Sequence, residues 1–145
     1  YNIYGHSAGA QFVHRYLLMS DKPKVKTAVA ANAGWYTFLD GSNFPYGLSN
    51  PPINFNSSNV RDFLQMDFHV LIGSADTDIT SSVNQSNGAN NQGANRFQRA
   101  NNFFSYTQKI VDQNKLEFNW SFQIVNGVAH SNSRMSRAAA QILLN

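Results

Sequence analysis

Four short apolar segments alternate along this chain with segments of helical periodicity. The apolar segments cover residues 1–4, 27–31, 68–72 and 118–125. Segments with an apolar residue about every third or fourth position follow them, at 8–19, 57–64, 96–114 and 133–144. This alternation is typical of an α/β fold, in which parallel strands form one sheet and helices cover its faces. In the first helix, Phe12 is among the apolar residues expected to face the sheet.

Two long connections interrupt the alternation. Residues 32–56 combine Asn, Gly and Pro with aromatic side chains that include Trp35, Tyr36, Phe38, Phe44 and Tyr46. Loops of this length are uncommon unless they have a function, so the aromatic loop is a candidate wall of a substrate site. Residues 74–95 are almost entirely polar or small, and they predict a flexible surface loop without regular structure.

The composition excludes several classes of function. The chain has 145 residues, enough for one domain, and no cysteine, which rules out a disulfide scaffold, an iron–sulfur cluster and a cysteine nucleophile. No apolar run of about 18 residues occurs, so no membrane span is expected. The net charge is +3 and the basic residues are scattered, which argues against a nucleic-acid partner. The histidines are widely spaced, so neither a metal nor a cofactor is expected.

The turn between the apolar segment 1–4 and the first helical segment carries the sequence Gly5-His6-Ser7-Ala8-Gly9, which fits the G-x-S-x-G pattern of a nucleophile elbow. In an elbow the serine lies on a sharp strand-to-helix turn, and small residues two positions before and after it let the strand and helix approach. The turn exposes the hydroxyl, and the helix N-terminus favours developing negative charge. Ser7 is therefore the candidate nucleophile, and the backbone N–H of Ala8 is a candidate oxyanion donor.

A serine nucleophile needs an imidazole base, and the chain has four histidines. His6 lies inside the elbow, too close in sequence to reach Ser7, and His14 falls on the first helix. His69 lies within a strand. His130 follows directly after a strand, in a turn, which is where this fold places the base. His130 is therefore the candidate base.

The imidazole in turn needs a carboxylate that fixes its tautomer. Asp76 and Asp78 come shortly after the strand 68–72, whereas Asp67 precedes that strand and lies at the opposite end of the sheet. Asp76 is favoured because its shorter turn places it nearer to the strand end, and Asp78 stays open as the alternative. The resulting order along the chain is serine, aspartate, histidine, as in elbow-containing α/β folds.

Three short phrases fall at the ends of the predicted strands: Gly5-His6-Ser7-Ala8-Gly9, Gly73-Ser74-Ala75-Asp76 and Gly127-Val128-Ala129-His130. Together they resemble the C-terminal half of an α/β-hydrolase. Two longer phrases are more specific, 5–15 (GHSAGAQFVHR) and 30–37 (AANAGWYT). They resemble bacterial hydrolases described as poly(3-hydroxybutyrate) depolymerases, close to the feruloyl-esterase-like group. The resemblance runs through nearly the whole chain and is weakest over 79–95.

In an α/β-hydrolase other strands precede the elbow, and a loop among them donates the second oxyanion N–H. The chain begins at Tyr1 within an apolar run, so we expect residues 1–145 to be a partial α/β-hydrolase domain without the N-terminal strands and the oxyanion loop. The missing N-terminal half of the domain is then the expected partner. Loss of one oxyanion donor costs about 2.7–4 kcal/mol of transition-state stabilisation, so we expect residues 1–145 alone to be inactive. The exposed strand edge also predicts instability.

These residues predict a serine hydrolase that cleaves carboxylic esters through an acyl-enzyme, on a polyester, a short acyl ester or a phenolic ester. His6, Trp35 and Tyr36 are candidate substrate-binding residues, with core packing as the alternative for the two aromatic ones. A peptidase or acyltransferase stays open, because the fold does not fix the reaction. The alternative from another class is a non-catalytic binding protein on the same scaffold.

Overall fold

The computed structural model describes residues 1–145 and contains four strands and five helices. The strands are β1 (Ile3–His6), β2 (Thr27–Ala31), β3 (Asp67–Gly73) and β4 (Trp120–Val125). The helices are α1 (Ala8–Met19), α2 (Ser57–Gln65), α3 (Asn87–Asn90), α4 (Arg96–Asn114) and α5 (Asn132–Leu143). None of the helices is long and apolar enough to cross a membrane.

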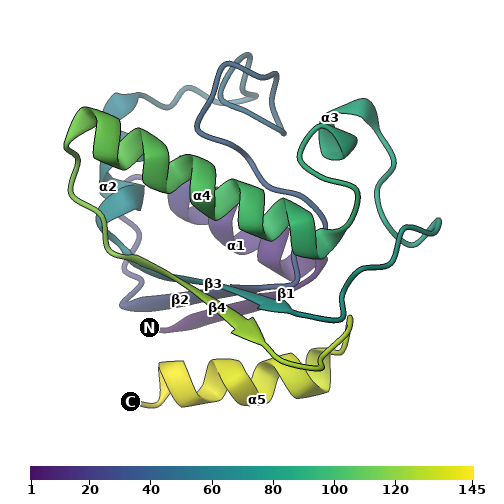
Figure 1. Ribbon diagram of the computed structural model, residues 1–145. Helices are drawn as coiled ribbons and strands as arrows, with labels where there is room; N and C mark the ends of the chain where they lie inside the picture. The colour runs from purple at the N-terminus through teal and green to yellow at the C-terminus, as the bar shows by residue number, and fades with distance from the viewer.

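All four strands run parallel in one sheet, in the order β1-β2-β3-β4. Helices α1, α2 and α4 lie on one side of the sheet, and α5 lies on the other (Figure 1). The predicted α/β fold with parallel strands and alternating helices is confirmed. Because the strands are parallel, all their carboxyl ends meet at the same edge of the sheet, where the turns after each strand lie side by side.

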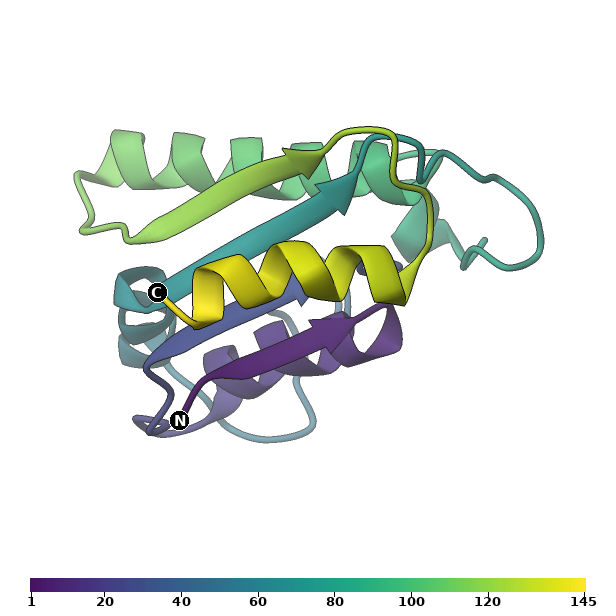
Figure 2. The same ribbon diagram turned by 90° about the horizontal axis from the view of Figure 1, so that it is seen from below.

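The two faces of the sheet are packed differently. Toward α1 and α4 the core is large and aromatic, and Phe63, Phe68 and Trp120 are in mutual ring contact. Toward α5 the core is small and includes Leu71 and Met135. Figure 2 shows α5 crossing the sheet over β1 and β2, with the face of β4 beside it uncovered. Polar side chains of β3 and β4 on that face are therefore only partly shielded from water.

Two expectations about the elements need correction. Phe12 was expected to face the sheet but is 59% exposed, whereas His14 on the same helix is fully buried. The buried residues of α1 are Ala10, Val13, His14, Leu17 and Leu18. His14 takes an inward position because its ring has hydrogen-bond partners there, the Ala10 carbonyl and the Thr37 N–H. The last strand begins at Trp120 rather than at residue 118.

The expectation of an irregular loop over 74–95 is also wrong in part. This segment contains the short helix α3, and it buries Val83 and Ala89. Fully buried Arg99 of α4 holds the later part of the segment, residues 84–93, because its guanidinium donates to backbone carbonyls of Asn84 and Gly93 at 2.9 Å. Hydrogen bonds from one buried arginine thus order a stretch that has few apolar side chains of its own.

Candidate active site

Ser7 lies in the turn between β1 and α1 and is the N-cap residue of that helix. Its backbone has φ 57° and ψ −117°, a conformation that residues other than glycine rarely adopt and that costs roughly 1–3 kcal/mol. Two backbone hydrogen bonds hold it: the Ser7 N–H donates to Ala31 at 2.9 Å, and the Gln11 N–H donates to Ser7 at 3.1 Å. The turn therefore has the strained geometry that its sequence pattern predicts.

Gly5 is required because β1 and α1 approach closely at the turn. A Cβ at position 5 would overlap the backbone carbonyl of Gly9, the second glycine of the pattern. A Cβ at Gly9 would meet open space, so the expectation that both glycines are sterically needed is correct only for Gly5. The Ala8 N–H is the first of α1 and has no carbonyl partner four residues back within the helix, which leaves it suited to bind an anion.

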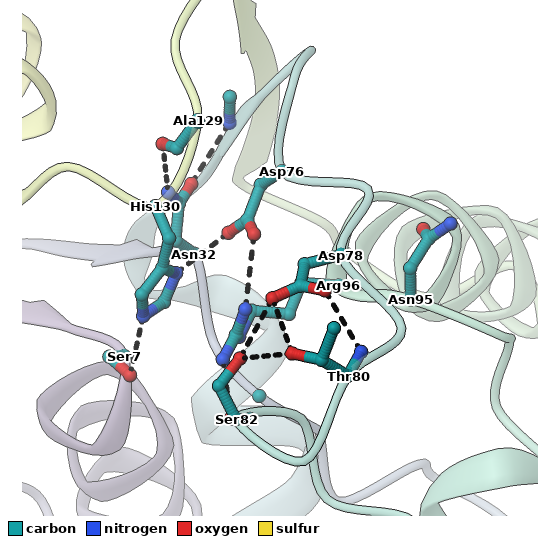
Figure 3. Close-up of polar contacts among 12 residues, drawn as sticks. Ser7, Asn32, Asp76, Asp78, Thr80, Ser82, Asn95, Arg96, Ala129 and His130 are labelled. Carbon is teal, nitrogen blue, oxygen red and sulfur yellow. Dashed lines mark hydrogen bonds and ion pairs between the residues drawn. The ribbon is translucent and has the colours of Figure 1, made fainter.

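His130 links Ser7 to Asp76 through two hydrogen bonds (Figure 3). Its Nε2 lies 2.9 Å from Ser7 Oγ, and its Nδ1 lies 2.8 Å from Asp76 Oδ2. A carboxylate only accepts hydrogen bonds, so Nδ1 donates and the Nε2 lone pair faces the serine hydroxyl. The side chain of His130 is 31% exposed, whereas that of Asp76 is 1% exposed. We call the series Ser7–His130–Asp76 the elbow chain.

Asp78, the alternative acid, does not contact His130. Its carboxylate accepts hydrogen bonds from the backbone and hydroxyl of Thr80 and from the hydroxyl of Ser82, at 2.8–2.9 Å. These bonds, those from Thr80 first, lower the pKa of Asp78 below its ordinary value. Asp78 is exposed and stabilises its own turn. Of the two aspartates, only Asp76 is placed against the imidazole.

Asn32, directly after β2, ties the turn of Asp76 to the turn of His130. Its fully buried side chain accepts from the Gly73 N–H at 2.9 Å and donates to the Ala129 carbonyl at 3.0 Å (Figure 3). The main chains also meet directly, since a Cβ at Gly73 would overlap the carbonyl of Val128. Sequence reasoning missed Asn32 as a site residue. The available signal was an asparagine, a residue that tolerates positive φ, immediately after a buried strand; its φ is 51°.

Arg96, the first residue of α4, is a second site residue that sequence reasoning missed. Its Nη1 donates to Asp76 Oδ1 at 3.2 Å, and its Nη2 donates to the carbonyl of Ser82 at 2.8 Å. The guanidinium is almost fully buried, with 5% of the side chain exposed. Twenty residues separate Arg96 from Asp76, and no motif joins them, so the sequence offered no signal for the pair.

His6 packs against His130. The two ring centroids are 4.6 Å apart, with the planes tilted by 41°. Burial first, and then the neighbouring His130, lowers the pKa of His6 to about 4, so this ring is neutral at neutral pH. Its Nε2 is buried and has no hydrogen-bond partner. The structure thus places this predicted substrate-binding residue beside the imidazole of the elbow chain.

The two aromatic candidates differ in their surroundings. Tyr36 is fully buried, and its ring stacks on Phe103 with centroids 4.4 Å apart. This corrects the expectation of substrate contact for Tyr36 in favour of core packing. Trp35 is 9% exposed, and the guanidinium of Arg15 lies 4.5 Å above its ring. Trp35 is therefore the aromatic candidate that lies nearer to the surface.

Three cavities are present, and none is lined by a residue of the elbow chain. One of about 450 Å³ lies between the aromatic loop and α4, with Phe38, Tyr46 and Tyr106 in its wall. No group of three or more His, Asp or Glu side chains is arranged to hold a metal ion. Ser7 is thus half-buried and lies outside the three cavities of the chain.

A second series of the same three residue types lies on the α5 side of the sheet. Ser121 Oγ lies 2.5 Å from His69 Nδ1, and His69 Nε2 lies 3.0 Å from Asp67 Oδ1. Thr27 donates to the other oxygen of Asp67 at 2.8 Å. These residues are register neighbours across β2, β3 and β4. We call the series Ser121–His69–Asp67 the flank chain; sequence reasoning set both His69 and Asp67 aside.

No protein-family model and no curated protein matches this chain. Solved structures do match it, and two of them are polymer hydrolases. Poly(aspartic acid) hydrolase-1 from Sphingomonas sp. KT-1 is 36% identical with a TM-score of 0.93, over 100% of this chain and 55% of that one. LpqC, a poly(3-hydroxybutyrate) depolymerase from Bordetella parapertussis, is 31% identical with a TM-score of 0.89, over 96% of this chain and 47% of that one.

The chain therefore spans about half the length of the solved structures that it matches. The match extends through the elbow, the sheet and the turns that carry Asp76 and His130, since it covers 96–100% of this chain. The resemblance to depolymerases is confirmed. With its parallel sheet, its alternating helices and this likeness, the chain has the α/β-hydrolase fold and corresponds in length to about half of each of these two structures.

Proposed function

We propose that the protein is a serine hydrolase that cleaves carboxylic esters, with Ser7 as nucleophile, His130 as base and Asp76 as the acid that orients it. The observation that carries the proposal is the elbow chain: hydroxyl, imidazole and buried carboxylate lie in one hydrogen-bonded series. The hydrolase names of both similar structures support a hydrolytic reaction.

In the proposed reaction Ser7 Oγ attacks the carbonyl carbon of the ester, and His130 Nε2 takes the hydroxyl proton. The Ala8 N–H and the N-terminus of α1 stabilise the oxyanion, and one such donor contributes about 2.7–4 kcal/mol. His130 then gives the proton to the leaving alcohol, which leaves an acyl ester on Ser7. Water, deprotonated by His130, hydrolyses that ester and restores the hydroxyl. Asp76 stabilises the imidazolium in both halves of the cycle.

We propose a polymeric substrate, because both similar structures are named for polymers. The position of Ser7, outside the cavities of this chain, is compatible with a long substrate lying across the site. Amide cleavage is the second candidate, because one similar protein is named for poly(aspartic acid). We propose that the part of such hydrolases that this chain does not cover supplies the second oxyanion donor and the rest of the substrate site.

The test is fluorophosphonate labelling of the protein in its longest expressed form, with peptide mass spectrometry to locate the label. We expect the label on Ser7, and its loss in the Ser7→Ala variant. A folded protein that takes no label would overturn the serine-hydrolase proposal and favour a binding protein on this scaffold. Hydrolysis assays on two substrates then distinguish the candidate reactions: a poly(3-hydroxybutyrate) oligomer tests ester cleavage, and a poly(aspartic acid) oligomer tests amide cleavage. Residues 1–145 run in parallel show whether this segment alone assembles a working site.

A further inference from the structure

Arg96 connects the elbow chain to α4. It is the first residue of that helix, directly after the N-cap Asn95, and its guanidinium reaches the turn that carries Asp76 (Figure 3). One amino group donates to Asp76 Oδ1 at 3.2 Å, and the other donates to the Ser82 carbonyl at 2.8 Å. The two terminal amino groups of the guanidinium thus bind two different points of the loop that follows β3, Asp76 and Ser82.

The two oxygens of Asp76 have separate partners. Oδ2 faces His130 Nδ1 at 2.8 Å, and Oδ1 faces Arg96 Nη1 at 3.2 Å. The backbone is held as well, since the Phe97 N–H donates to the Asp76 carbonyl at 3.1 Å. With 1% of its side chain exposed, Asp76 has no water to turn toward. A bond at Oδ1 therefore fixes the rotation of the carboxyl group and so the direction of Oδ2.

The guanidinium of Arg96 makes these two hydrogen bonds while a third donor group stays without a partner. Its Nε is buried without a hydrogen-bond partner, although an arginine exposed at a helix start could hydrate all of its N–H groups. The arrangement leaves a donor unsatisfied while it satisfies Asp76 Oδ1. Buried, uncompensated charge is unfavourable, so the guanidinium and the carboxylate compensate one another as a buried ion pair.

We propose that Arg96 is a positioning residue of the active site, which orients the Asp76 carboxylate toward His130. This inference rests on the proposed function, because it assigns Arg96 a part in the reaction of the elbow chain. Arg96 has no hydrogen bond to Ser7 or His130, and it acts through Asp76. Its contribution is greatest when His130 carries the transferred proton, because the bond from Nδ1 to Asp76 is then between two ions.

Arg99 provides a matched control on the same helix. It is also a fully buried arginine, one turn further along, but its partners are the carbonyls of Gly34, Asn84 and Gly93 and the side chain of Asn90. It has no contact with Asp76. Substitution of Arg99 therefore reports what loss of a buried arginine does to stability, apart from any effect on the carboxylate.

The test compares Arg96→Lys, Arg96→Gln, Arg99→Lys and Arg99→Gln in the longest expressed form of the protein, each checked for folding by its thermal midpoint. We expect Arg96→Gln to lower kcat and the rate of fluorophosphonate labelling about 10–100-fold with KM unchanged. Arg96→Lys, which keeps the positive charge, should retain most of the wild-type kcat. We expect both Arg99 variants to lower the thermal midpoint and to keep the kcat of the folded protein. Unchanged kcat in folded Arg96→Gln, or an equal loss of kcat in folded Arg99→Gln, would overturn the inference.

A proton NMR measurement separates this inference from the proposed function. The N–H of His130 that bonds to Asp76 gives a far-downfield resonance when the carboxylate is correctly oriented. We expect this signal in the wild-type protein and in Arg96→Lys, and its loss in Arg96→Gln. Its persistence in Arg96→Gln would refute the positioning role even if the wild-type protein proved not to react with fluorophosphonate. Absence of labelling with the signal lost as expected would refute the hydrolase proposal and keep the role of Arg96 in orienting Asp76.

Discussion

The molecule contains two hydrogen-bonded series of serine, histidine and aspartate, and they lie in different surroundings. In the elbow chain the serine lies on a strained turn at a helix N-terminus, whereas in the flank chain Ser121 lies within a regular strand. Asp76 is 1% exposed, but Asp67 is 43% exposed. A charge pair involving Asp67 is therefore screened by water, while one involving Asp76 is not.

The two imidazoles also face opposite ways. In the elbow chain Nδ1 faces the carboxylate and Nε2 faces the serine, whereas in the flank chain Nε2 faces the carboxylate and Nδ1 faces the serine. Both series nevertheless consist of the same three residue types joined by two hydrogen bonds, so composition alone does not separate them. Their placement does: the elbow chain lies where parallel strands end and a helix begins, so that backbone N–H groups and the serine hydroxyl converge. We expect substitutions in the two series to have different effects.

The largest difference is expected between the two serines. Ser7→Ala should lower kcat/KM by about 10⁴-fold or more and abolish fluorophosphonate labelling, because the nucleophile is removed. Ser121→Ala should leave kcat/KM within about twofold, because that hydroxyl is remote from the helix N-terminus. Steady-state kinetics on an ester substrate measure both. Comparable losses in the two folded variants would remove the distinction between the chains.

The aspartates should differ by a smaller factor. Asp76→Asn should lower kcat by about 10³–10⁴-fold, because an amide fails to hold the imidazole in the tautomer that accepts the serine proton. It also leaves Arg96 without its carboxylate partner, so some loss of stability accompanies it. Asp67→Asn should change kcat little and stability by less than about 1 kcal/mol, because water replaces the lost contact. A kcat for Asp76→Asn equal to that of Asp67→Asn would contradict the assignment.

Asn32 provides a test of how the elbow chain is assembled. Asn32→Ala leaves the Gly73 N–H and the Ala129 carbonyl buried without partners, which should destabilise the fold by about 2–4 kcal/mol. The corresponding change beside the flank chain, Thr27→Val, removes one hydrogen bond to the half-exposed carboxylate of Asp67 and should cost less than about 1 kcal/mol. Denaturant unfolding with a common m-value measures both. Equal losses of stability in the two variants would contradict the expectation that the hydrogen bonds of Asn32 contribute more than that of Thr27.

His14, which belongs to neither chain, limits the pH range over which the two can be compared. Its Nδ1 lies 2.9 Å from the Ala10 carbonyl, and its Nε2 accepts from the Thr37 N–H at 3.0 Å. Burial lowers the pKa of His14 from 6.5 to about 3. The unfolded chain thus binds more protons between these values, so stability is complete above pH 6.5 and is lost as the pH falls.

The expected loss is about 2 kcal/mol between pH 6.5 and pH 5. Chemical denaturation at pH 7 and pH 5 tests this, and His14→Gln supplies the control because glutamine does not titrate. The variant should have a lower stability at pH 7 and a smaller decline toward pH 5. An identical decline in both proteins would show that other groups cause the acid sensitivity.

Sequence reasoning predicted the parts of this molecule that depend on local pattern. The elbow around Ser7 is a contiguous motif, and the strand-to-turn positions of Asp76 and His130 follow from the alternation of elements. The choice between Asp76 and Asp78 came from turn length alone, and only the structure shows that Asp78 is occupied by Thr80 and Ser82. Positions relative to a strand end could thus be predicted, but not hydrogen-bond partners.

The parts that were missed depend on contacts between distant segments. Arg96 meets a carboxylate 20 residues away, and Asn32 meets a carbonyl 97 residues away. Residue type gave no warning in either case, since a helix-starting arginine is ordinarily solvated. Phe12 was expected inside because of its hydrophobicity, whereas His14 occupies the inward position because its imidazole has hydrogen-bond partners there.

The contact between Gly73 and Val128 has a consequence for how this protein tolerates change. The spacing of Asp76 and His130 is set where two main chains touch, with no side chain between them. A residue with a side chain at position 73 would push the turn that carries Asp76 away from the turn that carries His130 and lengthen the distance between them. In a saturation mutagenesis experiment position 73 would therefore be as intolerant of substitution as a catalytic position, although it carries no functional group. An insertion or deletion in either turn would likewise lower kcat.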